Sequence, residues 1–318
     1  MIRKIVTILK LIRLPNLLII ILTQLLLRYG ILRAFLYNDQ AGMMPGIIDF
    51  SILVAVTVLI AAGGYLINDY FDEDIDRINK PGDNKVGTEI SRRTLMVIYS
   101  VLNTVSILAG FYLAFRIKSL NFGLIFPLVA ILLWLYSSRY KRMLVRGNLV
   151  VAFLSALVVF IVWYFEFLHL RLHPSDFSRV LPELKETNLY FFGYGLFAFL
   201  VTLFREIIKD MEDVPGDQAY HRRTVPVVFG MNRARIVVTI LVAVTVLFLA
   251  NAQWTFHNRG MMLVFWYFTG IIQLPLLFLV YKLYRAGSRE DYHYLSNLCK
   301  LIMFAGVLSM QLISSSLL

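Results

Sequence analysis

The sequence predicts an all-α polytopic membrane protein with about nine transmembrane helices. Hydrophobic residues make up 59% of the 318 positions and charged residues only 16%, and the mean hydropathy is +0.71. A soluble domain has a smaller apolar share, so this composition is typical of a chain embedded in a bilayer. Stretches with few or no charges also recur, each long enough for the roughly 20 residues that cross a bilayer as a helix.

The predicted spans follow one another along the chain with more polar segments between them. We place them near residues 14–36, 47–67, 94–115, 119–138, 148–168, 189–208, 234–252, 260–281 and 294–316. We expect no cleaved signal peptide, because the first apolar run lacks a small-residue cleavage site and continues as a full span. No linker or change in composition marks a boundary, so we expect residues 1–318 to form a single domain.

Lysine and arginine are distributed unequally between alternate loops, which predicts the orientation of the chain. With the N-terminus on the cytoplasmic side, the outer segments carry only Arg28, Arg33, Arg116, Lys118, Arg171, Arg179, Lys185 and Arg259. The inner segments carry most of the other basic residues. The net charge of +11 then follows from topology and from contact with anionic lipid, and it does not indicate binding to nucleic acid.

Two aspartate-rich runs, at residues 68–76 and 209–217, share one spacing. When they are overlaid, three aspartates of one align with three of the other: Asp69, Asp72 and Asp76 with Asp210, Asp213 and Asp217. Carboxylates crowded at a bilayer boundary repel one another and are costly to desolvate, so they need a compensating charge. Mg²⁺ takes oxygen ligands and often bridges carboxylates to substrate phosphates. We therefore expect a membrane enzyme that holds a diphosphate ester through Mg²⁺, with both runs on the cytoplasmic side.

The first run has the spacing of a helical face. Asn68, Asp72 and Asp76 stand four residues apart, so they project from one side of a helix or of its unwound end. Asp69 lies one turn before Asp72 and on the same side as Asp76. The alternative is an ordinary solvated charge run, but cytoplasmic loops normally gather basic residues rather than acidic ones.

The second run also has the spacing of one helical face, but a proline is expected to interrupt the helix. Asp210, Asp213 and Asp217 stand at positions i, i+3 and i+7. Pro215 sits where a helix would end, so Asp217 is expected to reach the site from a loop or from the first turn beyond. Arg205 and Lys209 are natural counter-charges, either for these carboxylates or for phosphate oxygens, although basic residues here serve equally to orient the chain.

Both runs match the signatures of a known family. The patterns N-D-x-x-D-x-x-x-D at 68–76 and D-x-x-D-x-x-x-D at 210–217 resemble the two motifs of the UbiA superfamily of intramembrane prenyltransferases. Shorter stretches agree with the family's first-helix R-x-x-N, its Y-S-x-x-x-K-R…G-N loop and its basic-x-T-x-P segment. They lie at residues 13–16, 136–148 and 222–226.

The resemblance implies a helical bundle around a central cavity that is capped by the two motif loops. It also implies Mg²⁺-dependent transfer of an isoprenyl group from a polyprenyl diphosphate to an acceptor. The expected catalytic and metal-binding residues are Asn68, Asp72, Asp76, Asp213 and Asp217. The expected substrate-binding residues are Asn16, Asp69, Lys141, Arg142, Arg205, Lys209, Asp210, Arg222 and Arg223. We expect the protein in a bacterial or archaeal cell membrane with its active site facing the cytoplasm.

The sequence specifies the acceptor substrate less strongly than the prenyl donor. The run that begins at Asn68 is most similar to the branch of the family that makes di-geranylgeranylglyceryl phosphate, which implies geranylgeranyl diphosphate as donor and geranylgeranylglyceryl phosphate as acceptor. Three basic pairs, Arg92-Arg93, Lys141-Arg142 and Arg222-Arg223, suit a phosphorylated acceptor. They suit an aromatic carboxylate equally, so an aromatic prenyltransferase of quinone biosynthesis is the alternative.

Two other classes of membrane protein fit the sequence poorly. A CDP-alcohol phosphotransferase requires the pattern D-G-x-x-A-R…G-x-x-x-D-x-x-x-D in one run, and no such run occurs. A carrier with an acidic vestibule would place ionisable residues near the middle of its spans. The only clear mid-span acid is Glu166, and it lies close to an outer end.

Overall fold

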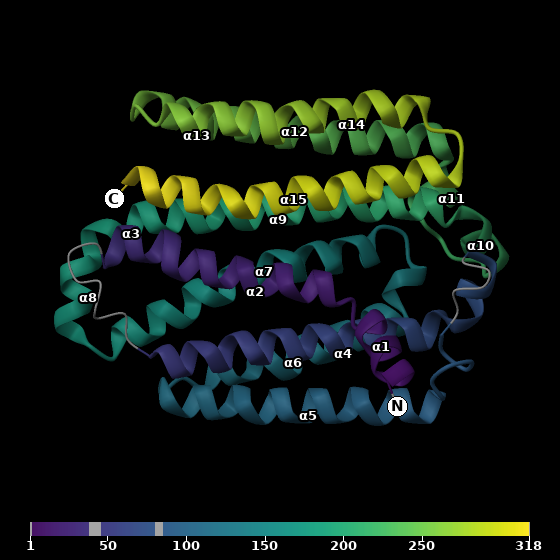
Figure 1. The fold of residues 1–318 in the computed structure, drawn as a ribbon, viewed down its shortest axis with the longest axis horizontal. Coiled ribbons are helices and arrows are strands. Elements are labelled where there is room, and N and C mark those ends of the chain that lie inside the picture. Colours follow the sequence, from purple (N-terminus) through teal and green to yellow (C-terminus); the bar gives the residue numbers. More distant parts are fainter. Residues whose placement is uncertain (1, 38–45, 80–84, 318) are drawn as a thin grey trace. The chain divides into compact units, whose positions relative to one another are not determined.

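The computed structural model describes residues 2–37, 46–79 and 85–317. This part of the chain is almost entirely helical, and its only β-type pairing is an isolated bridge between Val86 and Ile90. It contains nine helical segments that are long and apolar enough to cross a membrane, which confirms the predicted fold class (Figure 1). In chain order these segments are Leu14–Leu36, Ile47–Asn79, Arg92–Arg116, Leu120–Arg142, Arg146–Arg171, Pro174–Glu212, Met231–Asn258, Met262–Arg285 and Arg289–Leu317.

The individual elements are shorter than the spans where the helix changes type. They are α1 (Ile2–Leu11), α2 (Leu14–Leu26), η1 (Leu27–Leu32), α3 (Arg33–Leu36), α4 (Ile47–Asn79), α5 (Arg92–Arg116), α6 (Leu120–Ser138), η2 (Tyr140–Arg142), α7 (Arg146–Arg171), α8 (Pro174–Val180), η3 (Leu181–Glu183), α9 (Leu184–Glu212), α10 (Val214–Ala219), α11 (Val225–Phe229), α12 (Met231–Asn258), α13 (Met262–Tyr267), η4 (Phe268–Gln273), α14 (Leu274–Arg285) and α15 (Arg289–Leu317). Helices dominate because the bilayer offers no water to satisfy backbone groups, which must therefore bond within each segment.

Clustering of contacts divides the chain into two compact units. Unit 1 comprises Met1–Gln24, Met44–Lys141 and Trp163–Arg179, and unit 2 comprises Leu25–Met43, Arg142–Val162 and Val180–Leu318. The first aspartate run belongs to unit 1 and the second to unit 2. A single domain over residues 1–318 stays a prediction.

Unit 1 is built on α4, which packs against α5 and α6 (Figure 1). The close approach of α4 and α5 depends on a residue without a side chain: a Cβ atom at Gly63 would lie 2.7 Å from Asn103 Nδ2. α4 continues three turns beyond its predicted span, to Asn79, and this extension carries the first acidic run. The sequence analysis placed no helix at α1, whose last residue Leu11 packs in a cluster with Leu66.

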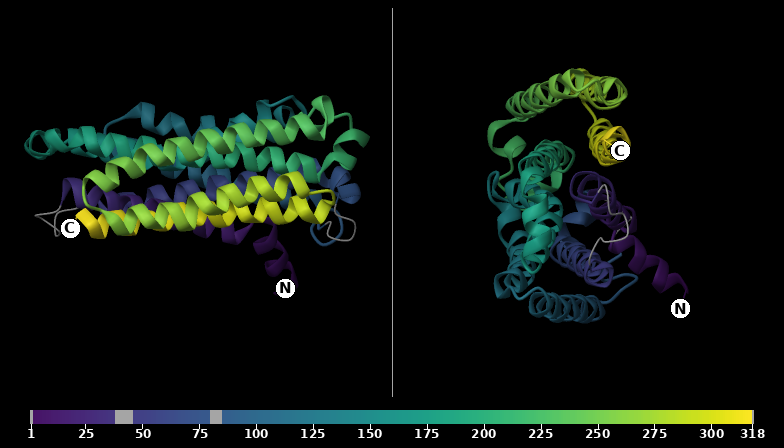
Figure 2. Two further views of the ribbon diagram at one scale, coloured as in Figure 1. Left: turned by 90° about the horizontal axis from the view of Figure 1, so that it is seen from above. Right: turned by 90° about the vertical axis from the view of Figure 1, so that its left-hand side faces the viewer.

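Unit 2 is built on α9, which packs against α12 and α15 (Figures 1 and 2). α14 in turn contacts α12 and α15. The start of α15 is fixed by a capping arrangement in which Asp291 Oδ2 accepts the backbone N–H groups of Gly287 and Ser288, each at 2.9 Å. The C-terminal end of α9 carries the second acidic run.

Candidate active site

The first acidic run lies on an unbroken helix, so its side chains follow helical spacing as predicted. Asn68 and Asp72 are buried, with 7% and 3% of their surfaces exposed, whereas Asp69 and Asp76 are half-buried. Asp74, which faces another direction, is exposed. The candidate ligands on α4 are therefore at least partly enclosed by the protein, whereas Asp74 faces outward.

Lys141 joins two of these candidate ligands. The chain leaves α6 at Ser138, and the short turn η2 places the Lys141 ammonium beside α4. Its Nζ donates to Asn68 Oδ1 at 3.1 Å and to Asp72 Oδ2, with which it forms an ion pair. The two oxygens thus converge on one cation, which is the arrangement that a bound positive ion would need.

Asp69 is held by the turn between α1 and α2. Arg13 has a φ of +53°, in the left-handed region, and its Nη2 donates to Asp69 Oδ1 at 3.1 Å. The guanidinium also lies 4.9 Å from the ring centre of Tyr65, whose hydroxyl accepts a hydrogen bond from Asn16 Nδ2 at 3.3 Å. Asn16 and Asp69, both expected to bind substrate, are therefore brought together through Arg13 and Tyr65.

Glu73 belongs to the same run but has a different set of partners. It accepts from Arg77 Nη2 at 3.1 Å and from Arg92 Nε at 2.5 Å. Its carboxylate also lies against Gly87, where a Cβ atom would approach Oε1 to 2.7 Å. Glu73 thus ties α4 to the segment before α5.

The second acidic run changes helix at Asp213. α9 ends at Glu212. Asp213 is the C-cap residue of α9 and also the N-cap residue of α10. Pro215 lies in the first turn of α10, a position that proline tolerates because its missing N–H is not needed there. Asp217, only 2% exposed, lies on α10. Asp217 therefore lies beyond the proline, on the short helix that follows the break, and its place in the site stays a prediction.

Asp210 accepts a hydrogen bond from Asn148, which is not among the predicted site residues. Asn148, near the start of α7, donates from Nδ2 to Asp210 Oδ2 at 2.8 Å and is itself buried. The only sequence signal for Asn148 was its place in the G-N part of the family-like loop. One turn earlier on α9, Arg205 Nη1 donates to Glu206 Oε1 at 2.7 Å, while Arg205 Nε is buried without a hydrogen-bond partner.

The basic residues expected to bind substrate differ in burial. Arg222 is 5% exposed, and its Nη1 lies 3.7 Å from Asp217 Oδ1. Arg223 and Arg142 are exposed, and they meet through their backbones, where Arg223 N–H donates to Arg142 O at 3.1 Å. Lys209 is half-buried on α9. The sequence predicts the same substrate-binding role for all four residues, but only Arg222 is buried.

The donor set suits Mg²⁺ in its chemistry. Asp213 Oδ1 is buried and has no hydrogen-bond partner, which leaves a carboxylate oxygen available to a cation. Among the described residues, no three His, Cys, Asp or Glu side chains gather as a ready-made metal site. Mg²⁺ keeps several water ligands and is usually bound by one or two carboxylates together with substrate phosphates, so it does not require a preformed cluster of three.

Comparisons of sequence show the family. A model of the UbiA prenyltransferase family matches residues 39–304. Digeranylgeranylglyceryl phosphate synthase of Methanosphaera stadtmanae is 31% identical over 259 residues, which cover 81% of this chain and 85% of that protein. The synthase of the same name from Korarchaeum cryptofilum is 30% identical over 277 residues, covering 86% and 88%.

Comparisons of structure show the same fold. A solved structure from work on digeranylgeranylglyceryl phosphate synthase in membranes aligns with a TM-score of 0.59 and 20% identity, covering 97% of this chain and 99% of that one. A UbiA homologue from Archaeoglobus fulgidus bound to GPP and Mg²⁺ aligns with a TM-score of 0.56 and 15% identity, covering 95% and 99%. The helical architecture, the paired acidic motifs and these matches agree: the chain belongs to the UbiA prenyltransferase family.

Proposed function

We propose that this protein transfers a geranylgeranyl group from geranylgeranyl diphosphate to the free hydroxyl of geranylgeranylglyceryl phosphate, in a Mg²⁺-dependent reaction. The allylic C–O bond of the donor breaks, diphosphate leaves, and the acceptor oxygen bonds to the allylic carbon as its proton is released. The observation that carries the proposal is the buried set of oxygen donors on α4, where Asn68 and Asp72 converge on a cation. The relatives named digeranylgeranylglyceryl phosphate synthase support the choice of acceptor.

The proposed metal-binding residues are Asn68, Asp72, Asp76, Asp213 and Asp217. Bound Mg²⁺ would neutralise the negative charge of the leaving diphosphate. Support comes from the side-chain types, which are hard oxygen donors, and from the free oxygen of Asp213. The Archaeoglobus homologue bound to a prenyl diphosphate and Mg²⁺ supports the same assignment by analogy.

The cationic side chains would bind the diphosphate and hold its charge. Lys141 in unit 1 and Arg205 and Arg222 in unit 2 are the strongest candidates, because each is at least partly enclosed. Arg205 has an unused buried donor at Nε, which a phosphate oxygen could accept. Fixed donors of this kind stabilise charge that develops on a leaving group, and they act most strongly where water is excluded.

The allylic carbon becomes cationic as the diphosphate leaves, so it must be kept from water. Aromatic ring faces stabilise such a cation electrostatically. Tyr65 and Tyr136 are candidates for this role: Tyr65 lies on α4 one turn before the acidic run, and Tyr136 is 9% exposed near the end of α6. Replacing Tyr65 by Phe would keep the ring face and remove only the hydroxyl that Asn16 contacts.

The acceptor can be tested directly. Purified protein would be incubated with Mg²⁺, labelled geranylgeranyl diphosphate and one of three acceptors: geranylgeranylglyceryl phosphate, 4-hydroxybenzoate or dihydroxynaphthoate. We expect a product of the mass of digeranylgeranylglyceryl phosphate and none with the aromatic acceptors, and Asp72→Ala as control should give no product. Prenylation of an aromatic acceptor alone would assign the protein to quinone biosynthesis and contradict the proposed acceptor.

A further inference from the structure

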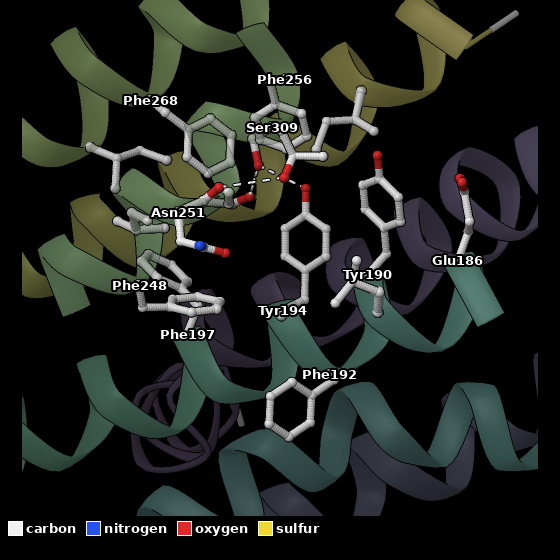
Figure 3. Close-up of a pocket in the computed structure, with 18 of the residues that line it drawn as sticks. Glu186, Tyr190, Phe192, Tyr194, Phe197, Phe248, Asn251, Phe256, Phe268 and Ser309 are labelled. Atoms are coloured by element: carbon white, nitrogen blue, oxygen red, sulfur yellow. Dashed lines mark hydrogen bonds between the residues drawn. The ribbon is translucent and has the colours of Figure 1, made fainter. Parts of the chain in front are cut away.

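Unit 2 contains a crevice of about 310 Å³ to which the proposed reaction assigns no role (Figure 3). It lies between α9, α12, η4 and α15, and aromatic rings from three of these elements form much of its wall. They are Tyr190, Tyr194, Phe197, Phe248, Phe256 and Phe268. Its volume falls at the lower end of the roughly 300–1,000 Å³ that small-molecule sites occupy.

The crevice is separate from the acidic run of the same unit. Both lie along α9, but Phe197, the α9 lining residue nearest the run, precedes Glu206 by roughly 13 Å of helix at 1.5 Å per residue. The crevice occupies the end of unit 2 where α9 begins and α12 ends, and the acidic run occupies the opposite end of α9. The charge pair at the mouth of the crevice therefore lies toward the opposite end of α9 from Glu206 and Asp210.

Four of the polar side chains around the crevice form two pairs, and Asn251 and Thr255 also line it. Inside, the hydroxyls of Tyr194 and Ser309 lie 2.9 Å apart and bond to each other (Figure 3). At the mouth, Arg259 donates to both oxygens of Glu186, at 2.9 and 3.0 Å. Both residues of this second pair remain partly exposed, at 36% and 41% of their side chains. The interior thus favours hydrocarbon, and the mouth offers one cation beside one anion.

We propose that the crevice binds one hydrocarbon chain of a zwitterionic phospholipid from the surrounding bilayer, with its phosphate against Arg259 and its ammonium against Glu186. The bilayer is the solvent of this unit, so an apolar crevice in it is filled by lipid rather than by water. Its rim continues into lipid-facing surface, since Leu189 and Phe192 are 62% and 56% exposed. A phosphate alone would meet the carboxylate of Glu186 as well as Arg259, whereas a headgroup with both charges complements the pair.

Two matched glycine substitutions test whether the crevice is the site. A Cβ atom at Gly193 would meet only Phe248 Cζ, at an ordinary 3.7 Å, so Gly193→Phe can place a ring in the crevice without a backbone clash. Gly270 lies outside the lining, and a Cβ atom there would meet nothing within 4 Å. Gly270→Phe therefore makes the same chemical change on exposed surface.

The measurement is native mass spectrometry of detergent-solubilised protein titrated with phosphatidylethanolamine or phosphatidylglycerol. We expect the wild type to retain one phosphatidylethanolamine, at least tenfold more tightly than phosphatidylglycerol. Gly193→Phe should weaken this binding at least tenfold and Gly270→Phe should leave it unchanged. Equal retention by the wild type and a monodisperse Gly193→Phe protein would overturn the site.

The charge pair is tested without altering the wall. Glu186→Gln removes the anion but keeps the shape of the mouth, so it should abolish the preference for phosphatidylethanolamine over phosphatidylglycerol. This test does not depend on the folding of Gly193→Phe. An unchanged preference in Glu186→Gln would overturn the headgroup assignment. So would displacement of phosphatidylethanolamine by geranylgeranyl diphosphate, because the occupant would then be a substrate of the proposed reaction and not a bilayer lipid.

Discussion

Lys141 and Asp72 form an ion pair that is largely enclosed, with 19% and 4% of their side chains exposed. The same ammonium donates to Asn68 at 3.1 Å. Breaking a buried pair by removing one partner typically costs ~3–5 kcal/mol, because the remaining charge loses its compensation. Asp72 therefore depends on a nearby cation, and we assign this role to Lys141 in the protein without substrate.

Lys141→Gln should lower kcat/KM by about 100-fold or more, since it removes a fixed positive charge from the proposed diphosphate site. Lys141→Arg should lose less, because it keeps the charge and changes only the geometry. Steady-state prenyl transfer would measure both. The matched control is Arg139→Gln, an exposed cation on the same segment; a loss in this control as large as in Lys141→Gln would refute a specific role for Lys141.

The acidic residues should separate into two classes. Asp72→Ala, Asp76→Ala, Asp213→Ala and Asp217→Ala should each reduce turnover by orders of magnitude. Folding should be largely kept in Asp76→Ala and Asp213→Ala, whereas Asp72→Ala and Asp217→Ala also break enclosed ion pairs and should lower Tm. Asp74→Ala, which alters an exposed acid of the same run, should retain near wild-type turnover. Near wild-type activity in one variant from each run would show that the two runs do not serve the reaction together.

Divalent metal should be required for activity and should bind the protein with its substrate. Ligands that bind only the folded state raise its stability by mass action, so Mg²⁺ together with a non-reactive prenyl thiodiphosphate should raise Tm. Asp213→Ala should show a smaller rise, because it removes the oxygen that has no protein partner. Full prenyl transfer in excess chelator is the result that would eliminate the metal from the mechanism.

Asn148 should act through Asp210. Asn148→Ala leaves the Asp210 carboxylate without its 2.8 Å donor, a loss that typically costs about 1–3 kcal/mol. We expect a lower Tm and lower kcat/KM in both Asn148→Ala and Asp210→Ala. In a double-mutant cycle the two substitutions together should cost little more than one alone. Fully additive effects would mean that the hydrogen bond does not couple these residues.

The predicted topology places both acidic runs on the cytoplasmic side. On a Cys299→Ala background, cysteines introduced at the exposed positions Thr88 and Gln218 should be shielded from a membrane-impermeant thiol reagent in intact cells. A cysteine at the exposed Ser178 should be labelled. If Thr88 and Gln218 reported opposite faces, the two runs could not share one substrate.

The sequence predicts the spans and the spacing of the acidic residues well, because both depend on local periodicity. Asn68 and Asp72 share a face by helical geometry alone, and Pro215 marks the change from α9 to α10. The hydrogen-bond partners of the acidic residues could not be predicted in the same way. Asn148 bonds Asp210 across 62 positions of sequence, and no local pattern encodes that contact.

Charge patterns also could not rank the basic residues. Arg222 and Arg223 are neighbours in sequence, yet one is buried beside Asp217 and the other is exposed. Their difference arises from the direction of the chain after α10, which depends on tertiary packing. The helix α1 has no counterpart among the predicted spans because its 10 residues are too few to cross a bilayer.

The central claim is that both acidic runs serve one diphosphate. The most direct measurement is calorimetric binding of geranylgeranyl thiodiphosphate in the presence of Mg²⁺ to the wild type, Asp72→Ala, Asp213→Ala and the double variant. The account predicts that each single substitution weakens binding at least 100-fold and that the double variant is little weaker than either single one. Wild-type affinity in one single variant, or losses that simply add, would contradict a shared site.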